Sequence, residues 1–270
     1  MTKHYLYSPI YSLLFILICF TSCNGQTKTD KTDKLDELIG AYSEYGKFNG
    51  SVLVAEKGEI IYSKGFGWAN VEEEIPNEAE TKFRLASVTK QFTAMLILQL
   101  VAENKLKLNV PISTYLPDYP KETGDMITIH HLLTHTSGIP DFTSFAGYSE
   151  MMDDHYNPEE LVQLFADSPL EFTPGKRFQY SNSGYVLLGF IIEKITAKTY
   201  EDVLQEKIFT PLGMTNSGVD HNDTKLRNAA KPYQRLGIEF QDATYIDMSI
   251  PFSAGAIYST VEDLYLWDQA

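Results

Sequence analysis

The sequence predicts a mixed α/β (α+β) fold that joins an antiparallel hairpin to several helices, and three patterns lead to this prediction. Apolar runs at residues 51–55 and 60–63 flank a short glycine-containing turn, which is typical of a β-hairpin. Residues 87–103 are the most apolar helical stretch of the chain. Capped helical patterns follow from residue 157 onward, whereas few strand patterns follow the hairpin.

Composition and charge narrow the class of protein. At 270 residues, the chain is long enough for one large domain or two small ones. A hydrophobic fraction of 43%, with 17 Tyr and 15 Phe, indicates a packed core rather than disorder. The formal net charge of −14 would repel phosphates, so we expect no nucleic acid partner.

The first residues are typical of an export signal. Lys3 gives a basic start, residues 10–20 are an apolar run too short to span a bilayer, and small residues precede Cys23. We interpret residues 1–22 as a lipoprotein-type signal peptide whose cleavage leaves Cys23 lipidated; an ordinary secretory signal with a chance cysteine is the alternative. The polar residues 23–34 would then tether a domain at 35–270 to the membrane, as in an exported lipoprotein of the bacterial cell envelope or periplasm.

Cysteine and histidine spacing argues against a metal or another cofactor. Only Cys19 and Cys23 occur, so the domain has no cysteine for a disulfide, a thiol nucleophile or a thiolate metal site. His131 and His135 have the spacing of helix-borne metal ligands, but no Glu follows His131 as in zinc proteases. We therefore expect structural roles for both histidines and no cofactor.

Each expected helix has a local signal. Residues 35–45 have apolar side chains at helical spacing and should pack near the hairpin. The helix at 87–103 is apolar on almost every face, so it should run buried through the middle of the domain. Asn157 caps the next helix, with Pro158 at its first position. The remaining expected helices cover 184–196 and 200–208, the latter ended by Pro211.

The last segment carries a helix start without a stop. Ser259-Thr260-Val261-Glu262 has the form of a capping box, and the apolar pattern after it continues to Ala270. A lone hairpin is marginal in water and needs partner strands. We therefore expect the domain at 35–270 to lack its C-terminal part.

Ser87-Val88-Thr89-Lys90 supplies a nucleophile and a base. Ser87 and Lys90, three residues apart on a helix, point to the same side one turn apart. At the helix start, backbone N–H groups and the positive end of the dipole favour a developing oxyanion. The same field and burial should lower the pKa of Lys90, so that its amine accepts the serine proton. A Ser-x-x-Lys string is common by chance, but a lysine inside so apolar a helix favours catalysis.

Tyr180-Ser181-Asn182 follows the turn signal Pro174-Gly175 and precedes a helix, so we expect it on a loop. A phenol stays protonated at neutral pH unless cations such as Lys90 lie beside it, in which case it serves as a general base. Asn182 is suited to orient a substrate amide carbonyl or to hydrogen-bond Lys90. Taken alone, this string fits an ordinary surface loop.

The order and spacing of the two strings resemble the serine β-lactamase and penicillin-binding protein superfamily, in particular its class C β-lactamase, D-alanyl-D-alanine carboxypeptidase and esterase branch. The resemblance implies a β-lactamase/transpeptidase-like fold, in which an antiparallel sheet flanked by helices packs against a mostly helical region. It covers about residues 48–270 and is carried by three further segments: Phe83-Arg84-Leu85-Ala86, Leu132-Leu133-Thr134-His135-Thr136-Ser137-Gly138-Ile139-Pro140 and Ala254-Gly255-Ala256-Ile257-Tyr258-Ser259-Thr260-Val261-Glu262-Asp263-Leu264.

The resemblance also implies a role for each site residue. Ser87 is the acylated nucleophile, Lys90 its proton partner, Tyr180 the base that later activates water or another acceptor, and Asn182 a contact for the substrate amide. The substrate would be a small-molecule or peptide-like acyl compound: an amide, a β-lactam or an ester.

The family's third motif is a strand with Lys or His, then Thr or a similar residue, then Gly, and this sequence does not contain it. In the family, that strand donates one of two oxyanion N–H groups, the other being that of the nucleophile. Losing one such donor costs about 10²–10³ in rate in a serine protease, so we expect this chain to be weakly active or inactive.

Two other functions stay open. A carboxylesterase of the same fold would turn over a short-chain ester in preference to a cephalosporin. A non-catalytic envelope protein that keeps the fold as a binding module would take no label at Ser87 from fluorescent penicillin or a fluorophosphonate.

Overall fold

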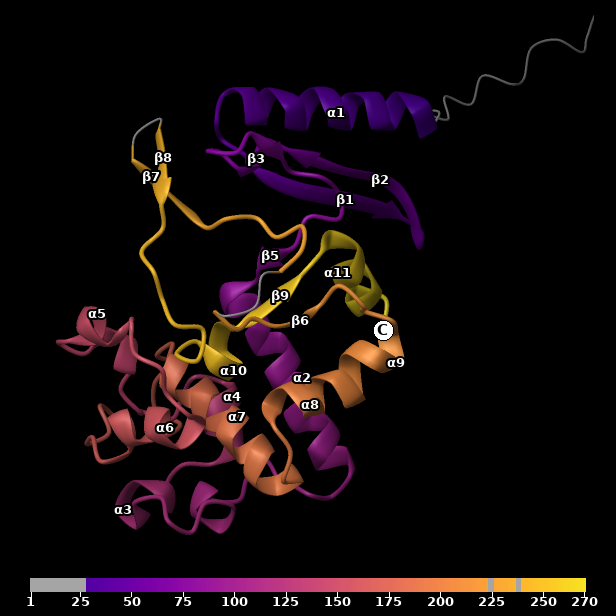
Figure 1. Cartoon of the computed structure of the whole chain (residues 1–270). Coiled ribbons are helices and arrows are strands. Elements are labelled where there is room, and N and C mark those ends of the chain that lie inside the picture. The colour runs from indigo at the N-terminus through magenta and orange to yellow at the C-terminus, as the bar shows by residue number, and fades with distance from the viewer. Residues whose placement is uncertain (1–27, 223–225, 237–238) are drawn as a thin grey trace, which may run out of the picture.

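The computed structural model describes residues 28–222, 226–236 and 239–270 (Figure 1). The predicted signal peptide, Cys23 with its predicted lipid and the first part of the predicted tether lie outside the described residues. None of the helices among the described residues combines the length and the apolar character that a membrane crossing requires.

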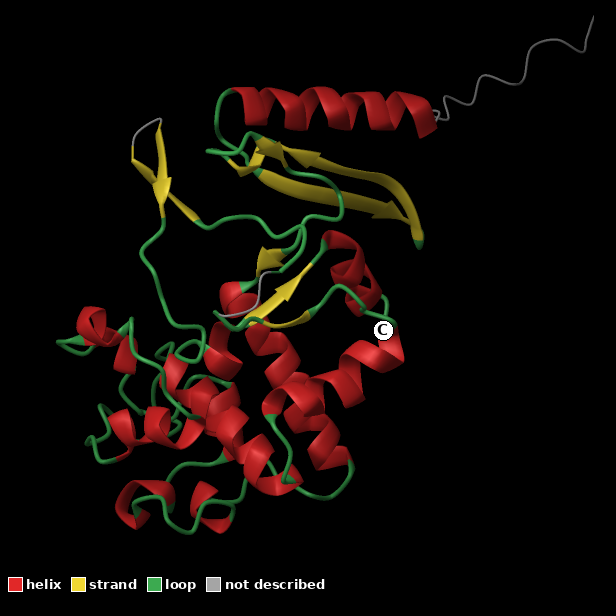
Figure 2. Cartoon of the chain, viewed as in Figure 1, coloured by secondary structure: helices red, strands yellow, loops and turns green. Residues whose placement is uncertain are grey.

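In Figure 2 the longer strands lie in the upper part of the molecule, beneath α1, and most of the other helices lie in the lower part. The α-helices are α1 (Lys28–Glu44), α2 (Thr89–Ala102), α3 (Lys121–Gly124), α4 (Ile129–Leu133), α5 (Tyr148–Met151), α6 (Pro158–Ala166), α7 (Asn182–Thr196), α8 (Tyr200–Leu204), α9 (Thr210–Leu212), α10 (Phe252–Gly255) and α11 (Val261–Asp268). The strands are β1 (Gly50–Glu56), β2 (Glu59–Phe66), β3 (Trp68–Asn70), β4 (Ile75–Pro76), β5 (Phe83–Arg84), β6 (Gly218–Val219), β7 (Tyr233–Leu236), β8 (Glu239–Asp242) and β9 (Ile257–Ser259). Three 3₁₀ turns, η1 (Ala86–Val88), η2 (Ile112–Thr114) and η3 (Phe142–Ser144), and one π turn, η4 (Gln205–Phe209), complete the elements.

The predicted hairpin is confirmed, and its turn explains its sequence. β1 pairs antiparallel with β2, and the two residues between them, Lys57 and Gly58, have φ of +54° and +81°. Positive φ at both central residues matches the right-handed twist of the flanking strands. The glycine adopts this conformation without steric cost.

Helix α1 covers the hairpin, as the sequence predicts, but it starts earlier. The Asp36 carboxylate accepts hydrogen bonds from the Lys64 ammonium at 2.5 Å and the Tyr62 hydroxyl at 2.8 Å, both on β2. The helix begins at Lys28 rather than at residue 35, so the second half of the predicted tether is helical.

The strands after the hairpin are more numerous than expected: the described residues contain seven, β3 to β9, each only two to four residues long, and one small sheet leads into the site. β9 lies between β5 and β6 and pairs antiparallel with both. Because β5 ends three residues before Ser87, this sheet fixes where the chain enters α2.

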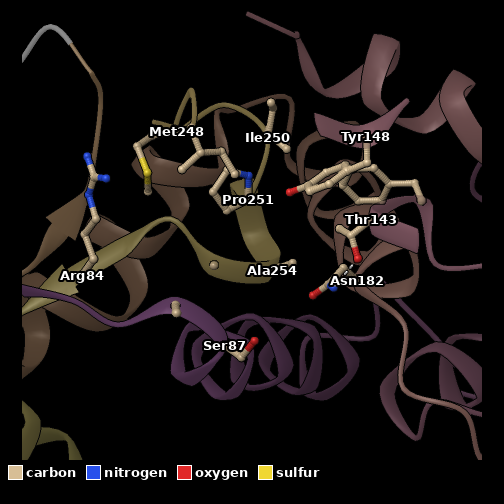
Figure 3. Close-up of a pocket in the computed structure, with 13 residues that line it drawn as sticks. Arg84, Ser87, Thr143, Tyr148, Asn182, Met248, Ile250, Pro251 and Ala254 are labelled. Carbon is tan, nitrogen blue, oxygen red and sulfur yellow. Dashed lines mark hydrogen bonds between the residues drawn. The ribbon is translucent and has the colours of Figure 1, made fainter. Parts of the chain in front are cut away.

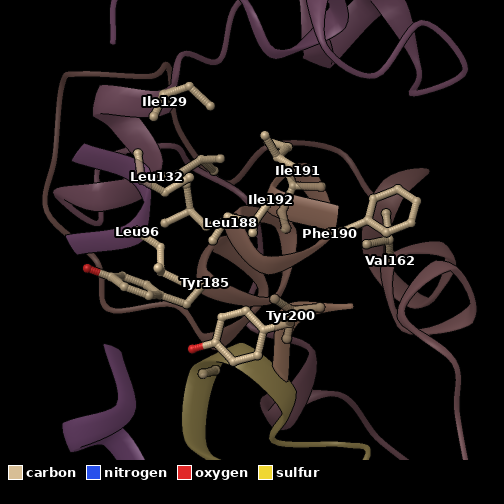
Figure 4. Close-up of a cluster of buried hydrophobic side chains, with 14 of the residues drawn as sticks. Leu96, Ile129, Leu132, Val162, Tyr185, Leu188, Phe190, Ile191, Ile192 and Tyr200 are labelled. Carbon is tan, nitrogen blue, oxygen red and sulfur yellow. The ribbon is translucent and has the colours of Figure 1, made fainter. Parts of the chain in front are cut away.

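The core lies where α2, α7 and α10 meet (Figure 4). Leu96 of α2 and Leu188 and Ile191 of α7 are fully buried there. The prediction that α2 is buried on all sides is wrong for one face. Val88 just before the helix is 43% exposed, and Met95 and Leu98 on α2 are 38% and 45% exposed.

Two predicted helix boundaries need correction. Pro211 does not end the helical path from Tyr200, which continues through η4 and α9 to Gly213 at φ +71°. The proline lies at an early position of α9, where its missing N–H costs little. By contrast, Asn157 caps α6 with Pro158 in the first turn, as predicted.

The cap of α11 is Thr260, one residue later than the predicted capping box. Its hydroxyl accepts the Asp263 N–H at 3.2 Å. Ser259 ends strand β9 instead, and its buried hydroxyl lies 2.7 Å from that of Ser217. The pairing of β9 in the small sheet therefore overrides the local capping signal.

Candidate active site

Ser87 sits at a sharp bend between strand and helix. The Leu85 N–H donates to the Ile257 carbonyl at 2.8 Å, and Ala86 then takes φ +46°, a left-handed conformation unusual for a residue with a Cβ. Such a residue costs on the order of 1–3 kcal/mol and persists only where its surroundings hold it. Ser87 follows in the 3₁₀ turn η1, so the α-helix begins two residues later than predicted. The bend leaves the Ser87 side chain exposed to solvent.

Lys90 is buried behind the serine and donates to three oxygen atoms. Its ammonium lies 3.2 Å from Ser87 Oγ, 2.9 Å from Asn182 Oδ1 and 2.8 Å from the Ala254 carbonyl oxygen. The residue is 6% exposed. Burial lowers the pKa of Lys90 from its usual range, while Tyr180 and Asp141 act in the opposite direction with less effect. Neutral amine is therefore available at lower pH than for a surface lysine.

Tyr180 lies beside both Ser87 and Lys90. Its hydroxyl lies 2.7 Å from Ser87 Oγ, and Lys90 Nζ stands 4.9 Å from the centre of its ring. The structure thus brings together all four residues that the sequence singles out: Ser87, Lys90, Tyr180 and Asn182, which we call the catalytic corner. Their chemical roles stay predictions.

Asn182 is oriented by a residue that the sequence reasoning missed. It is the first residue of α7 rather than a loop residue, and its amide nitrogen donates to Asp141 Oδ2 at 3.1 Å. This bond turns the amide oxygen of Asn182 toward Lys90. Asp141 comes directly after the quoted segment that ends at Pro140, and that position was the only signal.

His135 holds the segment that carries Tyr180. Its Nδ1 accepts the Ser181 N–H at 3.2 Å, and its ring lies over the Tyr180 ring at 4.6 Å between centres. Burial, and then Lys90, lower the pKa of His135, so the imidazole is neutral at pH 7 and can accept this bond.

His131, the other histidine of the pair spaced four residues apart, also bonds to the backbone. His131 Nδ1 accepts the Thr128 N–H at 3.3 Å in the capping box of α4. Among the described residues, no group of His, Cys, Asp and Glu side chains has the arrangement of a metal site.

Helix α10 carries the third acceptor of Lys90 and is packed tightly against α2 and α7. The Thr93 hydroxyl of α2 donates to the Ser253 carbonyl at 2.7 Å, and the Ser253 hydroxyl donates to the Tyr185 carbonyl at 2.8 Å. Gly189 of α7 lies so close that a methyl group there would overlap the Ser253 side chain. These contacts fix the carbonyl of Ala254, whose role the sequence does not reveal.

A cavity of about 270 Å³ opens beside Ser87 (Figure 3). Ser87, Thr143 and Asn182 are polar members of its wall. The larger side chains of the wall are apolar or aromatic: Phe142, Tyr148, Ile246, Met248, Ile250 and Pro251. We call this space the apolar cavity.

Arg84 is the one charged residue in the wall of the apolar cavity. In Figure 3 its side chain extends away from Ser87. Its Nε donates at 2.5 Å to the carboxylate of Asp220, which is 4% exposed. The pair links β5 to the residue after β6 and leaves this end of the cavity close to neutral.

Comparison with known proteins identifies the family of this chain. A family model described as Beta-lactamase matches residues 35–269. The putative penicillin-binding protein PbpX of Bacillus subtilis (strain 168) is 33% identical over 245 residues, which are 89% of this chain and 59% of that protein. Among solved structures, a penicillin binding protein from Bacillus halodurans has a TM-score of 0.75 at 35% identity, covering 84% of this chain and 70% of its own.

A D-amino acid amidase from Ochrobactrum anthropi SV3, complexed with L-phenylalanine, has a TM-score of 0.76 at 30% identity, covering 88% of this chain and 68% of its own. The chain spans about half the length of the curated relatives that it matches, from 44% to 59%. The family match over nearly the whole described chain and the shared fold lead to one conclusion. This chain belongs to the beta-lactamase family.

Proposed function

We propose that this protein is an acyl-transferring serine hydrolase in which Ser87 forms a covalent acyl-enzyme. One observation carries the proposal: the exposed Ser87 hydroxyl lies within hydrogen-bonding distance of both the Lys90 nitrogen and the Tyr180 hydroxyl. A nucleophile that touches a base of lowered pKa and a second proton carrier has the arrangement of an activated serine.

The first half of the reaction acylates the serine. The neutral amine of Lys90 takes the proton from Ser87 Oγ while Oγ bonds to the substrate carbonyl carbon. The oxyanion collapses, the bond to the leaving group breaks, and Tyr180 gives its hydroxyl proton to the leaving oxygen or nitrogen. Lys90 then returns its proton to Tyr180, so charge and protons balance.

The second half releases the acid. Water gives a proton through Tyr180 to Lys90 as its oxygen bonds to the acyl carbon. The bond from carbon to Ser87 Oγ then breaks, and Oγ recovers the proton. Burial of Lys90 supports this cycle, because the amine needs to be neutral at the start of each half.

The substrate class follows the family at a coarse level: an ester, an amide or a β-lactam. Among the described residues we identify one of the two oxyanion donors that the family uses, the N–H of Ser87. Because one missing donor costs about 10²–10³ in rate in a serine protease, we expect slow acylation by this chain.

Covalent labelling tests the proposal. The chain is treated with a fluorescent penicillin and, separately, with a fluorophosphonate, and the added mass is mapped by peptide mass spectrometry. We expect one label, on Ser87, and none in Ser87→Ala. Ser149→Ala is the control, since Ser149 is an exposed serine that bonds to Glu150 and has no contact with the catalytic corner.

Two results would point elsewhere. No label on folded protein over hours would favour the binding module that keeps the fold without the chemistry. Labelling by the fluorophosphonate and turnover of a short-chain ester, with no reaction toward a penicillin or cephalosporin, would favour the carboxylesterase.

A further inference from the structure

We propose that the apolar cavity binds the acyl part of the substrate and selects an uncharged, apolar acyl group, with no ammonium beside the carbonyl. The proposal rests on the proposed function, because it assigns an occupant to the cavity next to Ser87. It adds the substrate's charge and polarity, which neither the family nor the catalytic corner determines.

The position of the cavity determines which part of the substrate enters it. Ser87 and Asn182 belong both to its wall and to the catalytic corner. A carbonyl carbon in contact with Ser87 Oγ therefore extends one of its substituents into this space. At about 270 Å³ the cavity is at or below the roughly 300–1,000 Å³ usual for ligand sites, so that substituent is small.

The wall offers no counter-charge to a cation. None of the lining residues is acidic, and Lys90 does not line the cavity. Asp141 and Asp220 do not line the cavity, and they accept hydrogen bonds from the lining residues Asn182 and Arg84. An ammonium next to the scissile carbonyl would lose water without gaining a partner, which is costly for any charge.

Most of the cavity wall is apolar and favours contact with an apolar acyl group. Phe142 and Ile250 are 2% and 1% exposed, and Met248 is 4% exposed, so they form a fixed surface. Ile246 and Pro251 are half-buried beside them. Filling this space with carbon removes apolar surface from water on both the wall and the acyl group, which favours binding.

One polar atom faces the cavity without a partner. The Tyr148 side chain points its hydroxyl into the space (Figure 3), and no described residue hydrogen-bonds to it. Burial raises the pKa of Tyr148, so it is a neutral phenol at pH 7 and adds no charge. It can serve one neutral polar atom of the acyl group.

A pair of esters that differ in one charge tests the selection. The p-nitrophenyl esters of 4-methylpentanoic acid and of leucine share a carbon skeleton, and only the second carries an α-ammonium. Each second-order acylation rate is divided by the ester's rate with hydroxide, which removes the effect of the ammonium on carbonyl reactivity. We expect the neutral ester to react at least about tenfold faster, for either enantiomer of leucine, because an unpaired charge is expensive to bury.

A charge placed in the wall should reverse the preference. Ile246 is half-buried and its carbonyl, which accepts the Asn222 amide, is unaffected by a change of side chain. Ile246→Glu should favour the leucine ester relative to the neutral ester by about tenfold over its isosteric control, Ile246→Gln. Because each readout is a ratio on one protein, a partly unfolded variant still reports.

The outcomes separate the two proposals. Equal corrected rates, or a faster leucine ester, would overturn the cavity assignment. Neither result would contradict the proposal that the protein is a serine hydrolase. Failure of both esters to acylate Ser87 would count against the hydrolase instead. In that case Ser87→Ala and wild type are titrated with 4-methylpentanamide and leucinamide by NMR: tighter binding of the uncharged amide supports the assignment, and the reverse order overturns it.

Discussion

The catalytic corner and the apolar cavity share a wall, yet they are built in opposite ways. In the corner, Lys90 contacts Ser87, Asn182 and Ala254 at once, so each polar group depends on the others. In the cavity, side chains such as Met248 and Ile250 contribute separate apolar contacts. Groups that act as a unit show non-additive losses, whereas independent contacts add. In the proposed reaction, the chemistry would therefore depend on a network, and the choice of acyl group on a surface whose residues contribute separately.

The largest effect is expected when the proposed base, Lys90, is removed. Lys90→Met should slow labelling of Ser87 by about 10²–10⁴-fold, the usual contribution of general acid–base catalysis. Combining it with Tyr180→Phe should cost little more than the worse single change, because the two groups handle one proton. Labelling rates of the two single variants and the double variant measure this, with the exposed Lys176→Met as control. If the fold-loss in the double variant equals the product of the two single losses, Lys90 and Tyr180 act independently. The catalytic corner would then not be a network, and its contrast with the cavity would not hold.

The next largest effect is expected at Asp141, which contacts Asn182 and not the reacting atoms. Asp141→Asn removes the charged acceptor of the Asn182 amide and leaves that amide free to turn its oxygen from Lys90. We expect labelling to fall about ten- to hundredfold, since a hydrogen bond to a charged group is worth about 1.5–3 kcal/mol. The exposed Asp153→Asn gives the same change of charge far from the corner. An equal loss in both variants would mean that long-range charge, not orientation of Asn182, is responsible.

A smaller effect concerns the support of Tyr180. His135→Asn keeps a side-chain acceptor and tolerates the left-handed backbone at φ +56°, but it loses the ring that packs on Tyr180. His135→Phe keeps a ring and loses the acceptor for the Ser181 N–H. Each should slow labelling by about fivefold, near the 1 kcal/mol of a neutral hydrogen bond. If both variants are labelled at the wild-type rate and circular dichroism shows that they are folded, His135 only fills space and does not position Tyr180.

The smallest effect is on stability. Because the pKa of His135 is lowered in the folded protein, the unfolded chain binds a proton more readily just below pH 6.5. The free energy of unfolding should therefore fall as pH drops from 7.5 through that window, and fall less in His135→Asn. Urea unfolding of both proteins at pH 7.5 and 5.5 measures the difference. A parallel fall in the two would show that His135 is not protected from protonation.

Local pattern was enough to predict the parts of the site that lie within one turn or one loop. The spacing of Ser87 and Lys90 on a helix, the caps at Asn157 and the hairpin at 50–66 all follow from neighbouring residues. Boundaries failed where distant pairing decides: Ser259 belongs to β9 because β5 and β6 flank that strand, so the cap of α11 moves to Thr260.

The rest of the site depends on contacts between segments that are far apart in the sequence. Asp141 meets Asn182 across 41 residues, and Ala254 meets Lys90 across 164. Neither has a local pattern that marks it, because an aspartate after a proline or a carbonyl in a short helix is ordinary by itself. The exposed face of α2 escaped prediction for a similar reason: hydrophobicity shows that a face is apolar, not that something covers it.

The close packing at Gly189 has a consequence for the genetics of this protein. It lies in the middle of α7, away from the reacting atoms, yet α10 rests against it. Substituting alanine there would push Ser253 outward and carry the neighbouring carbonyl away from the lysine. An inactivating lesion at this glycine would then mimic loss of a catalytic group, and Ser253→Gly would relieve only part of the overlap, because the Phe252 ring would also lie 2.8 Å from the new methyl.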